Sequence, residues 1–377
     1  MSIFERLQEE LEGLEDKEKH KGYWYGISDA LLVLVCGMLC GLQRIDDIHD
    51  WARSKPTRQF LEKEFGMEKI FCRAQFYNLL GYVDAEKFRI SFSSWMQSIV
   101  NSKKEKRTIA IDGKTVCSTD KLRDDGSVLH IASAIISELN LVIGHQPCDT
   151  KMGEITAFRD LVELLDVSGS IVVADALHCN QKSCEAVVKE SADYLFVVKD
   201  NQRNLRDDIE YYIQNEEIRS FQTIERNGGR IEKRTAYVTS NISWLNDKDR
   251  FKNLQIIGAI HREFEKGDHK TSEWHYYISS ANLTPKQLLK HARLEWAVES
   301  MHWLLDVHFN EDKTAVWDMN VQQLLNTTRK IALNLVRIFK NQCAPKKALS
   351  RIMRENLFDL EQLASFLHLF LTDFKLD

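Results

Sequence analysis

Two short apolar runs along the chain each end at an aspartate, and they predict two buried strands. Residues 109–111 precede Asp112, and residues 171–174 precede Asp175. Uninterrupted apolar strands are typical of a sheet covered on both faces, where the functional site lies at the strand ends. Taken alone, Asp112-Gly113 equally indicates a simple turn. Because the arrangement occurs twice, we expect a strand that ends at Asp112, a turn at Gly113, and the two carboxylates side by side.

The segments around these runs alternate between the periods of strands and helices. A hairpin is predicted at 128–136 and 141–146, helices at 154–165, 181–191 and 205–215, and a further strand at 194–198. This order is typical of a ribonuclease H-like core. From about 218 to 282 the pattern changes to strands alone, which predicts a β-rich insertion in an α/β fold with a mixed sheet.

Helical patterns flank this core on both sides. An N-terminal helical domain is predicted at 1–101, a core domain with the insertion at 102–340, and a C-terminal helical segment at 341–377. The N-terminal part contains an amphipathic piece at 4–16 and helices at 27–42, 46–54, 73–80 and 85–100, with Lys55-Pro56 ending the helix at 46–54. Further helices are predicted at 320–340 and 346–370.

A long helix is predicted from Thr284 to Phe309. Its start is well marked, because Thr284, Pro285 and Gln287 supply an N-cap, a first-turn proline and a capping-box partner. The helical period of 3.6 residues places four ionisable side chains on one face: Glu295, Glu299, His302 and Asp306.

Apolar side chains lie on both flanks of that ionisable face, among them Trp296 and Trp303. A helix that is apolar on both flanks is largely buried, and burying several ionisable groups is costly unless they are paired or bind metal. A charged surface face is the alternative interpretation. We favour a functional face that supplies a third acid, and we expect Trp303 to pack in the core.

The composition describes a soluble globular protein rich in helix, with 44% hydrophobic and 28% charged residues among 377. A formal net charge of -5 neither indicates nor excludes nucleic-acid binding. Eight cysteines without a Cys-x-x-Cys pair indicate a reduced, cytoplasmic protein, and a zinc site at His178, Cys179 and Cys184 matches no common spacing. The apolar stretch at 30–42 is too short to span a bilayer, so no membrane association is expected. No P-loop or dinucleotide fingerprint occurs.

Three stretches together resemble one family. AIDGKTV at 110–116, VVADALHCNQKS with YLFVVKDNQ at 172–202, and EWAVESMHWLLDVHFNEDKTAVW at 295–317 look like the three catalytic regions, in order, of the DDE transposases of bacterial insertion sequences, in the H-repeat-associated group. The helical start, with VCGMLCGL and the pair Trp51-Ala52, is similar to the associated N-terminal domain. The resemblance covers nearly the whole chain.

This resemblance implies a metal-dependent enzyme that cuts and joins transposon ends. Asp112, Asp175 and Glu299 match the acidic triad, and two Mg²⁺ or Mn²⁺ ions are expected on them, with Asp112 between the ions. The chemistry agrees, because neighbouring carboxylates repel unless a divalent cation holds them, and two-metal sites catalyse phosphodiester cleavage. The family's tyrosine and arginine before the glutamate are here Ala292 and Glu295. Which of Glu295 and Glu299 binds metal therefore stays open.

The expected partners are the ends of an insertion sequence and target DNA, both double-stranded, bound by a homodimer in the cytoplasm at the nucleoid. Five side chains in or near the motifs are candidates for phosphate contacts, each equally interpretable as an ordinary surface charge: Lys114, Lys199, Asn201, Arg203 and Arg293. Two alternatives are kept: a nuclease of the same core that cuts without joining, and an inactive transposase retained as a DNA-binding protein.

Overall fold

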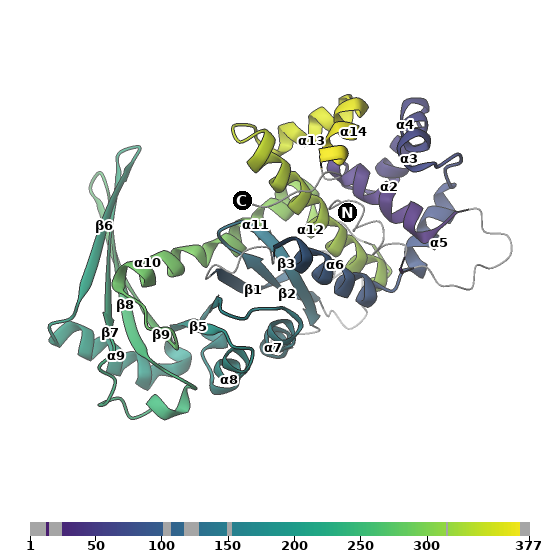
Figure 1. Ribbon diagram of the computed structural model, residues 1–377. Helices are drawn as coiled ribbons and strands as arrows, with labels where there is room; N and C mark the ends of the chain where they lie inside the picture. The colour runs from purple at the N-terminus through teal and green to yellow at the C-terminus, as the bar shows by residue number, and fades with distance from the viewer. Residues whose placement is uncertain are drawn as a thin grey trace.

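The computed structural model describes residues 13–14, 25–100, 107–116, 128–148, 153–313 and 316–369 (Figure 1). The amphipathic piece predicted at 4–16 falls almost wholly outside these residues. Among the residues described, no helix is both long enough and apolar enough to cross a membrane.

Nine strands in the described residues form one continuous sheet in the spatial order β3-β2-β1-β4-β5-β9-β8-β7-β6. The strands are β1 (Thr108–Val116), β2 (Leu129–Ile136), β3 (Leu141–Cys148), β4 (Ile171–Ala174), β5 (Asp193–Val198), β6 (Ser220–Asn227), β7 (Arg230–Thr239), β8 (Ile256–Lys266) and β9 (His269–Ser279). β1, β4 and β5 run parallel, and β2 and β3 are antiparallel to their neighbours. This half of the sheet confirms the predicted ribonuclease H-like core.

The predicted β-rich insertion consists of β6 to β9 and extends the core sheet. β9 pairs with β5 in antiparallel register from Leu195↔Ser279 to Val198↔Tyr276. The strands of the insertion then continue outward, and Figure 1 shows them reaching away from the helices of the two chain ends. The insertion and the core therefore share one network of backbone hydrogen bonds.

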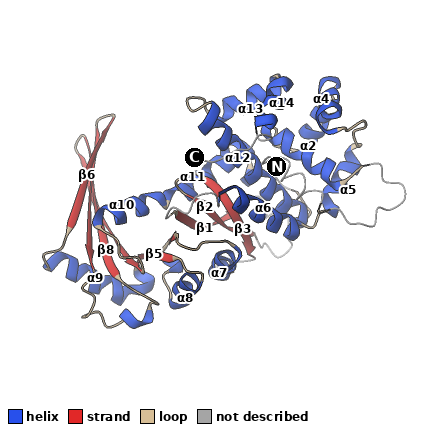
Figure 2. Ribbon diagram, in the orientation of Figure 1, coloured by secondary structure: helices blue, strands red, loops and turns tan. Residues whose placement is uncertain are grey.

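Helices cover both faces of this sheet, as Figures 1 and 2 show. α7 (Glu154–Leu164), α8 (Gln181–Lys189) and α9 (Arg203–Asn215) lie along one face. α10 (Pro285–Leu294), α11 (Trp296–Phe309) and α12 (Met319–Cys343) lie along the other. The continuous apolar runs of β4 and β5 follow from this double covering, since both of their faces are buried.

The remaining helices form a body at one end of the sheet. They are α2 (Ile27–Leu39), α3 (Ile45–Arg53), α4 (Lys55–Phe65), α5 (Arg73–Tyr82), α6 (Ala85–Val100), α13 (Leu349–Phe358) and α14 (Leu360–Leu369). α12 runs through this body and packs against α2, α6 and β3. One hydrophobic core in the described residues extends from α2 through the sheet to α14. The domain boundaries at 101–102 and 340–341 stay predictions.

α12 also closes the outer edge of the sheet at β3. The side-chain amide of Asn334 donates to the carbonyl of Val142 at 2.7 Å, and its oxygen accepts from the Val142 amide at 2.9 Å. An open edge strand would expose unpaired backbone groups, so this side chain takes the place of a further strand.

The helix predicted at 46–54 ends before Lys55-Pro56 as expected, since α3 ends at Arg53. The pair also opens α4, which was not predicted: proline is tolerated in its first turn, and Ser54 caps the helix by accepting from the Thr57 amide. Two other predicted helical segments are each divided in two. The helix predicted at 346–370 is divided at Asp359 into α13 and α14. The helix predicted from Thr284 to Phe309 is divided at Glu295 into α10 and α11.

Candidate active site

Asp112 and Asp175 are neighbours because β1 and β4 are paired in parallel. Ile111 pairs with Ala174, and each aspartate is the next residue along the chain. Adjacent strands lie about 4.8 Å apart, so the two carboxylates leave the sheet at the same edge. β1 does not turn at Gly113 as predicted, because β2 continues to pair with it as far as Val116↔Leu129. β4, in contrast, ends at Ala174, so Asp112 has no paired residue on that side of β1.

The chain after β4 fixes Asp175 in place. Asp175 caps a short 3-10 helix at 176–178, and its Oδ1 accepts a hydrogen bond from the Leu177 amide at 2.9 Å. The side-chain amide of Asn201, from the loop after β5, donates to the carbonyl of Ala176. This contact joins the ends of β4 and β5, so Asn201 supports the loop that carries Asp175.

Glu299 approaches the same edge from the first turn of α11. The predicted N-terminus of the preceding helix is confirmed, since Thr284 and Gln287 form a capping box on α10. The face predicted from the helical period also points to the strand edge: Glu295 and Glu299 line one pocket with Asp112, and Nε2 of His302 lies 3.7 Å from Oδ2 of Asp112. The predicted burial of Trp303 was wrong, because 60% of its surface is exposed.

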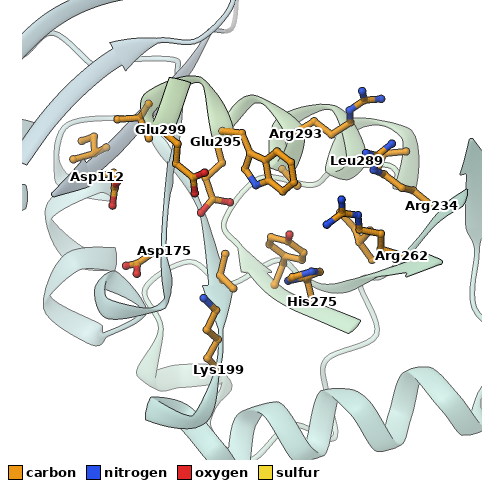
Figure 3. Close-up of a pocket in the computed structure, with 17 residues that line it drawn as sticks. Asp112, Asp175, Lys199, Arg234, Arg262, His275, Leu289, Arg293, Glu295 and Glu299 are labelled. Carbon is orange, nitrogen blue, oxygen red and sulfur yellow. The ribbon is translucent and has the colours of Figure 1, made fainter. Parts of the chain in front are cut away.

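The pocket has a volume of about 400 Å³ and two sides of opposite charge (Figure 3). Asp112, Asp175, Glu295 and Glu299 gather on one side, with Lys199 reaching in from the end of β5. The other side is formed by the insertion, by α10 and by Trp296 at the start of α11. Its principal side chains are Arg234, Arg262, His275, Arg293 and Trp296.

Burial and mutual repulsion make the acidic side electrostatically strained. Burial raises the pKa of Asp112 to about 6, and the charges of Glu154 and Asp175 contribute to the rise. Burial likewise raises the pKa of Glu295 to about 7, where Asp175 adds to the effect and Lys199 opposes it. Each of these carboxylates is therefore easier to ionise once a cation is bound.

The neighbouring imidazole does not supply that positive charge. Burial lowers the pKa of His302 to about 3, so the ring beside Asp112 is neutral. Its Nε2 has no hydrogen-bond partner in the described residues.

The donor set fits a divalent cation such as Mg²⁺ or Mn²⁺. Such hard cations prefer carboxylate oxygens, and the acidic side offers several in one pocket whose like charges raise one another's pKa. Within the described residues, no group of three His, Cys, Asp or Glu side chains already stands in a metal-binding arrangement. For Asp112, Asp175 and Glu299 to hold a metal ion together, their side chains would have to move from the positions described. The zinc alternative finds no support, since Cys179 and Cys184 are buried thiols.

The five predicted phosphate contacts are placed differently. Lys199 lines the pocket, and no carboxylate of the described chain lies within ion-pair distance of its ammonium group. Arg293 also lines the pocket and pairs with Glu225. Arg203 is exposed on α9, outside the pocket lining, with its Nε 3.8 Å from Asp207. Asn201 holds the loop after β4, as described above.

Lys114 lies outside the pocket lining and is largely buried. Its ammonium group pairs with Asp306, with Glu311 at 3.0 Å and with Asp312 at 3.3 Å, and only 15% of the side chain is exposed. A phosphate contact would require these ion pairs to break. The geometry supports a role in holding β1 to the end of α11.

Sequence reasoning missed the arginines contributed by the insertion. Arg234 and Arg262 line the pocket, yet they lie far from the recognised motifs. One signal was present: Arg230, Glu232 and Arg234 alternate along β7, and alternate residues of a strand share one face.

Two family models identify the class of the protein. A family model described as "Transposase DDE domain" matches residues 103–335, and a second, described as "DDE_Tnp_1-associated", matches residues 8–96. The chain belongs to the DDE transposase family, which confirms the resemblance.

The relatives are bacterial proteins of similar length. The chain is 32% identical to the "H repeat-associated putative transposase YhhI" of Escherichia coli K12 over 375 residues, which covers 96% of this chain and 97% of that one. It is 30% identical to the "Putative transposase YncI" of Escherichia coli O157:H7 over 340 residues, covering 87% and 85%. Among solved structures, a piggyBac transposase synaptic complex with hairpin DNA aligns with a TM-score of 0.46 at 10% identity, over 98% of this chain and 78% of that chain.

Proposed function

We propose that this protein is a DDE transposase that cuts DNA at the ends of an insertion sequence and joins those ends to target DNA. The parallel register of β1 and β4 carries the proposal, because it sets Asp112 beside Asp175 at a strand edge that Glu299 also faces. Acids on one strand, at the end of the next strand and on one helix suit a phosphodiester substrate, whose transfer needs charge stabilisation more than covalent catalysis.

Asp112, Asp175 and Glu299 would hold the divalent ions. Bound there, Mg²⁺ or Mn²⁺ supplies activation of the attacking water or 3′-hydroxyl and stabilisation of the leaving oxygen. The chain's own contribution is to hold these acids in place. The register of the sheet fixes Asp112, the capping of the Leu177 amide fixes Asp175, and Lys199 offers a positive charge to the phosphate beside them.

The proposal includes the partners and the setting of the reaction. Double-stranded DNA is the substrate, with Lys199 and Arg293 as phosphate contacts inside the pocket and Arg203 outside it. A homodimer holds two ends together, and the reaction takes place on the chromosome in the cytoplasm.

Cleavage of a DNA that carries the flanking inverted repeats tests this function. We expect the wild type to cut it only with Mg²⁺ or Mn²⁺, and we expect Asp112→Asn to abolish cutting. Asp208→Asn is the matched control, because this aspartate is exposed on α9, outside the pocket lining, and its loss should leave cutting unchanged.

The alternatives give different results in the same system. A nuclease that does not join ends would cut the repeat DNA but would give no joined product from a pre-cut end. An inactive transposase would bind the repeat DNA and show no metal-dependent cutting. This last alternative is kept because a second glutamate, Glu295, lies on the acidic side of the pocket and adds a like charge there.

A further inference from the structure

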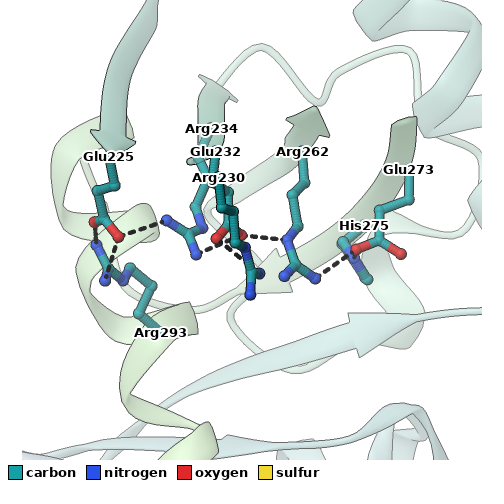
Figure 4. Close-up of polar contacts among 8 residues, drawn as sticks. All are labelled: Glu225, Arg230, Glu232, Arg234, Arg262, Glu273, His275 and Arg293. Atoms are coloured by element: carbon teal, nitrogen blue, oxygen red, sulfur yellow. Dashed lines mark hydrogen bonds and ion pairs between the residues drawn. The ribbon is translucent and has the colours of Figure 1, made fainter. Parts of the chain in front are cut away.

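A row of arginines and glutamates crosses the insertion and ends at the pocket (Figure 4). We call it the arginine ladder. Its members are Glu225 on β6, Arg230, Glu232 and Arg234 on β7, Arg262 on β8, Glu273 on β9 and Arg293 on α10. Three of its arginines, Arg234, Arg262 and Arg293, line the same pocket as Asp112 and Asp175.

At two positions the ladder places like charges directly opposite one another, whereas Arg262 is opposite the unlike charge of Glu273. Arg234 pairs with Arg262 in the register of β7 and β8, and Glu225 pairs with Glu232 in the register of β6 and β7. Like charges at opposed positions of neighbouring strands destabilise a sheet. A network of ion pairs that served only stability would alternate arginine and glutamate across the strands. The observed arrangement instead concentrates guanidinium groups on one face.

One buried carboxylate holds this arrangement together. Glu232, with 8% of its side chain exposed, accepts from Arg234 at 2.5 Å, from Arg230 at 3.2 Å and from Arg262. The planar guanidinium of Arg262 also lies over the ring of Trp296, with its carbon 5.4 Å from the ring centroid. Arg262 is therefore fixed in orientation at the rim of the pocket.

The other two carboxylates are exposed and exchangeable. Glu225 contacts Arg293 and lies 3.2 Å from Arg234, and 44% of its side chain is exposed. Glu273 lies 2.8 Å from Arg262, and 49% of its side chain is exposed. Exposed ion pairs contribute little to stability, so an incoming anion can replace these two glutamates at small cost.

The charges of this side favour a polyanion. Four cations, the ladder arginines, face three carboxylates, Glu225, Glu232 and Glu273, which leaves an excess of one positive charge. A guanidinium group bridges two oxygens of a phosphate in the same way as two oxygens of a carboxylate.

We propose that the arginine ladder binds the phosphodiester backbone of DNA next to the cleaved bond, with backbone phosphates replacing Glu225 and Glu273 while Glu232 keeps the arginines in position. The proposal rests on the proposed function only in taking DNA as the substrate. It assigns Arg234 and Arg262 a role in binding that the motifs did not indicate.

Binding measured without cleavage tests the ladder separately from the proposed function. The probe is a labelled duplex carrying a terminal inverted repeat, titrated with the full-length protein in EDTA at several salt concentrations. Arg262→Gln should raise the Kd about tenfold or more, the usual effect of losing a hydrogen bond between charged groups. The slope of log K against log salt should fall by about one, as for one lost phosphate contact.

The glutamates distinguish the proposal from a purely structural ladder. Glu225→Gln removes a competitor of the phosphate, so it should tighten binding, whereas Glu232→Gln should weaken it. Arg351→Gln is the control, because Arg351 is an exposed arginine on α13 that pairs with Glu355 at 3.0 Å. Its affinity should equal that of the wild type.

Two results would overturn the proposal: wild-type affinity and salt slope in Arg262→Gln, or unchanged affinity in Glu225→Gln. Should Arg262→Gln fail to fold by circular dichroism, Glu225→Gln decides alone, since this exposed residue is not needed for folding. Ladder-dependent binding without any cutting would support the ladder and contradict the proposed function. Metal-dependent cutting by a protein whose DNA binding does not depend on the ladder would support the proposed function and contradict the ladder proposal.

Discussion

Lys114 on β1 and Glu311, just beyond α11, form an ion pair of 3.0 Å inside the protein. Burial alone would raise the pKa of Glu311, but Lys330 and Lys114 together hold it below its usual range. Lys114 lies two residues after Asp112, and it also pairs with Asp306 on the helix that carries Glu299. This cluster therefore ties the strand of one proposed metal ligand to the helix of another.

Replacing Lys114 tests the strength of this connection. Lys114→Met removes the ion-pair partner of the buried Glu311, which keeps the hydrogen bond from Asn326 and the nearby charge of Lys330. The free energy of unfolding should fall by about 3 kcal/mol, as for other broken buried pairs. Lys270→Met is the matched control, since Lys270 is 70% exposed and pairs with Glu265 at 3.1 Å. That change should cost less than about 1 kcal/mol. Urea unfolding measures both, and equal losses would show that the Lys114 cluster does not hold β1 to α11.

Gly113 is predicted to tolerate no side chain. A Cβ there would lie 2.5 Å from Oε2 of Glu154 and 2.5 Å from Nε2 of His130, two groups that hydrogen-bond to each other at 2.7 Å. Gly113→Ala should therefore cost roughly 2 kcal/mol through overpacking, and it should impair cleavage because Asp112 is adjacent.

Gly81→Ala provides the comparison for Gly113. Gly81 lies in α5, and the nearest atom to an added Cβ is Oδ2 of Asp318 at 4.0 Å. Alanine should stabilise this helix by up to about 1 kcal/mol. Thermal unfolding of the two variants checks the pair. An unaffected melting temperature in Gly113→Ala would mean that the Glu154–His130 contact yields easily.

Metal binding should stabilise the protein in a pH-dependent manner. The folded-state pKa of Asp112, about 6, and that of Glu295, about 7, lie above the ordinary values of 3.8 and 4.5. A raised pKa gives stability that is present at low pH and is lost as the pH rises through the folded value. The metal-free protein should therefore lose stability between about pH 4 and pH 7 from these groups.

Added Mn²⁺ should reverse that loss. We expect a larger rise in melting temperature with Mn²⁺ at pH 8 than at pH 5, because the carboxylates are ionised and repel one another only at the higher pH. Asp112→Asn should reduce the rise at pH 8. A Mn²⁺ effect of the same size in wild type and Asp112→Asn would place the bound ion elsewhere.

The two glutamates of the acidic side should have unequal roles. Glu299→Gln should lower the rate of cleavage by at least about 100-fold, the scale seen when one electrostatic group of an active site is lost. Glu295→Gln, which changes a neighbour of the proposed ligands, should lower it by no more than about tenfold. Single-turnover cleavage of repeat DNA measures both. The opposite ranking would assign the third ligand to Glu295.

The sequence pattern was sufficient to predict the features that a single strand or helix determines. The apolar runs before Asp112 and Asp175 predicted their strands, and the helical period placed Glu299 and His302 on the face turned to β1. In both cases residues close in sequence set the direction of the side chain.

Features that depend on distant partners could not be predicted in this way. The turn expected at Gly113 is absent because β2 pairs with β1 beyond that point, which the Asp-Gly pair does not encode. Trp303 was expected in the core because its flank is apolar, but nothing in the described chain covers that side of α11 fully. The arginine ladder joins four strands and a helix, so its members are close only after the sheet has formed.

The sheet that joins the core and the insertion also fixes how far Arg262 lies from Asp175. Two strands, β5 and β9, separate β4, which ends at Asp175, from β8, which carries Arg262. Three strand spacings amount to about 14 Å across the sheet. The register adds an offset along the strands, because Gly258 is level with Asp175 and lies four residues, or about 13 Å, before Arg262. Because these strands are hydrogen-bonded to one another, this distance cannot change by a hinge between core and insertion. The two offsets combine to about 20 Å, so a backbone phosphate on Arg262 would lie about six nucleotide steps of B-form DNA from the bond at Asp175, and DNA of any other geometry would have to bend to reach both.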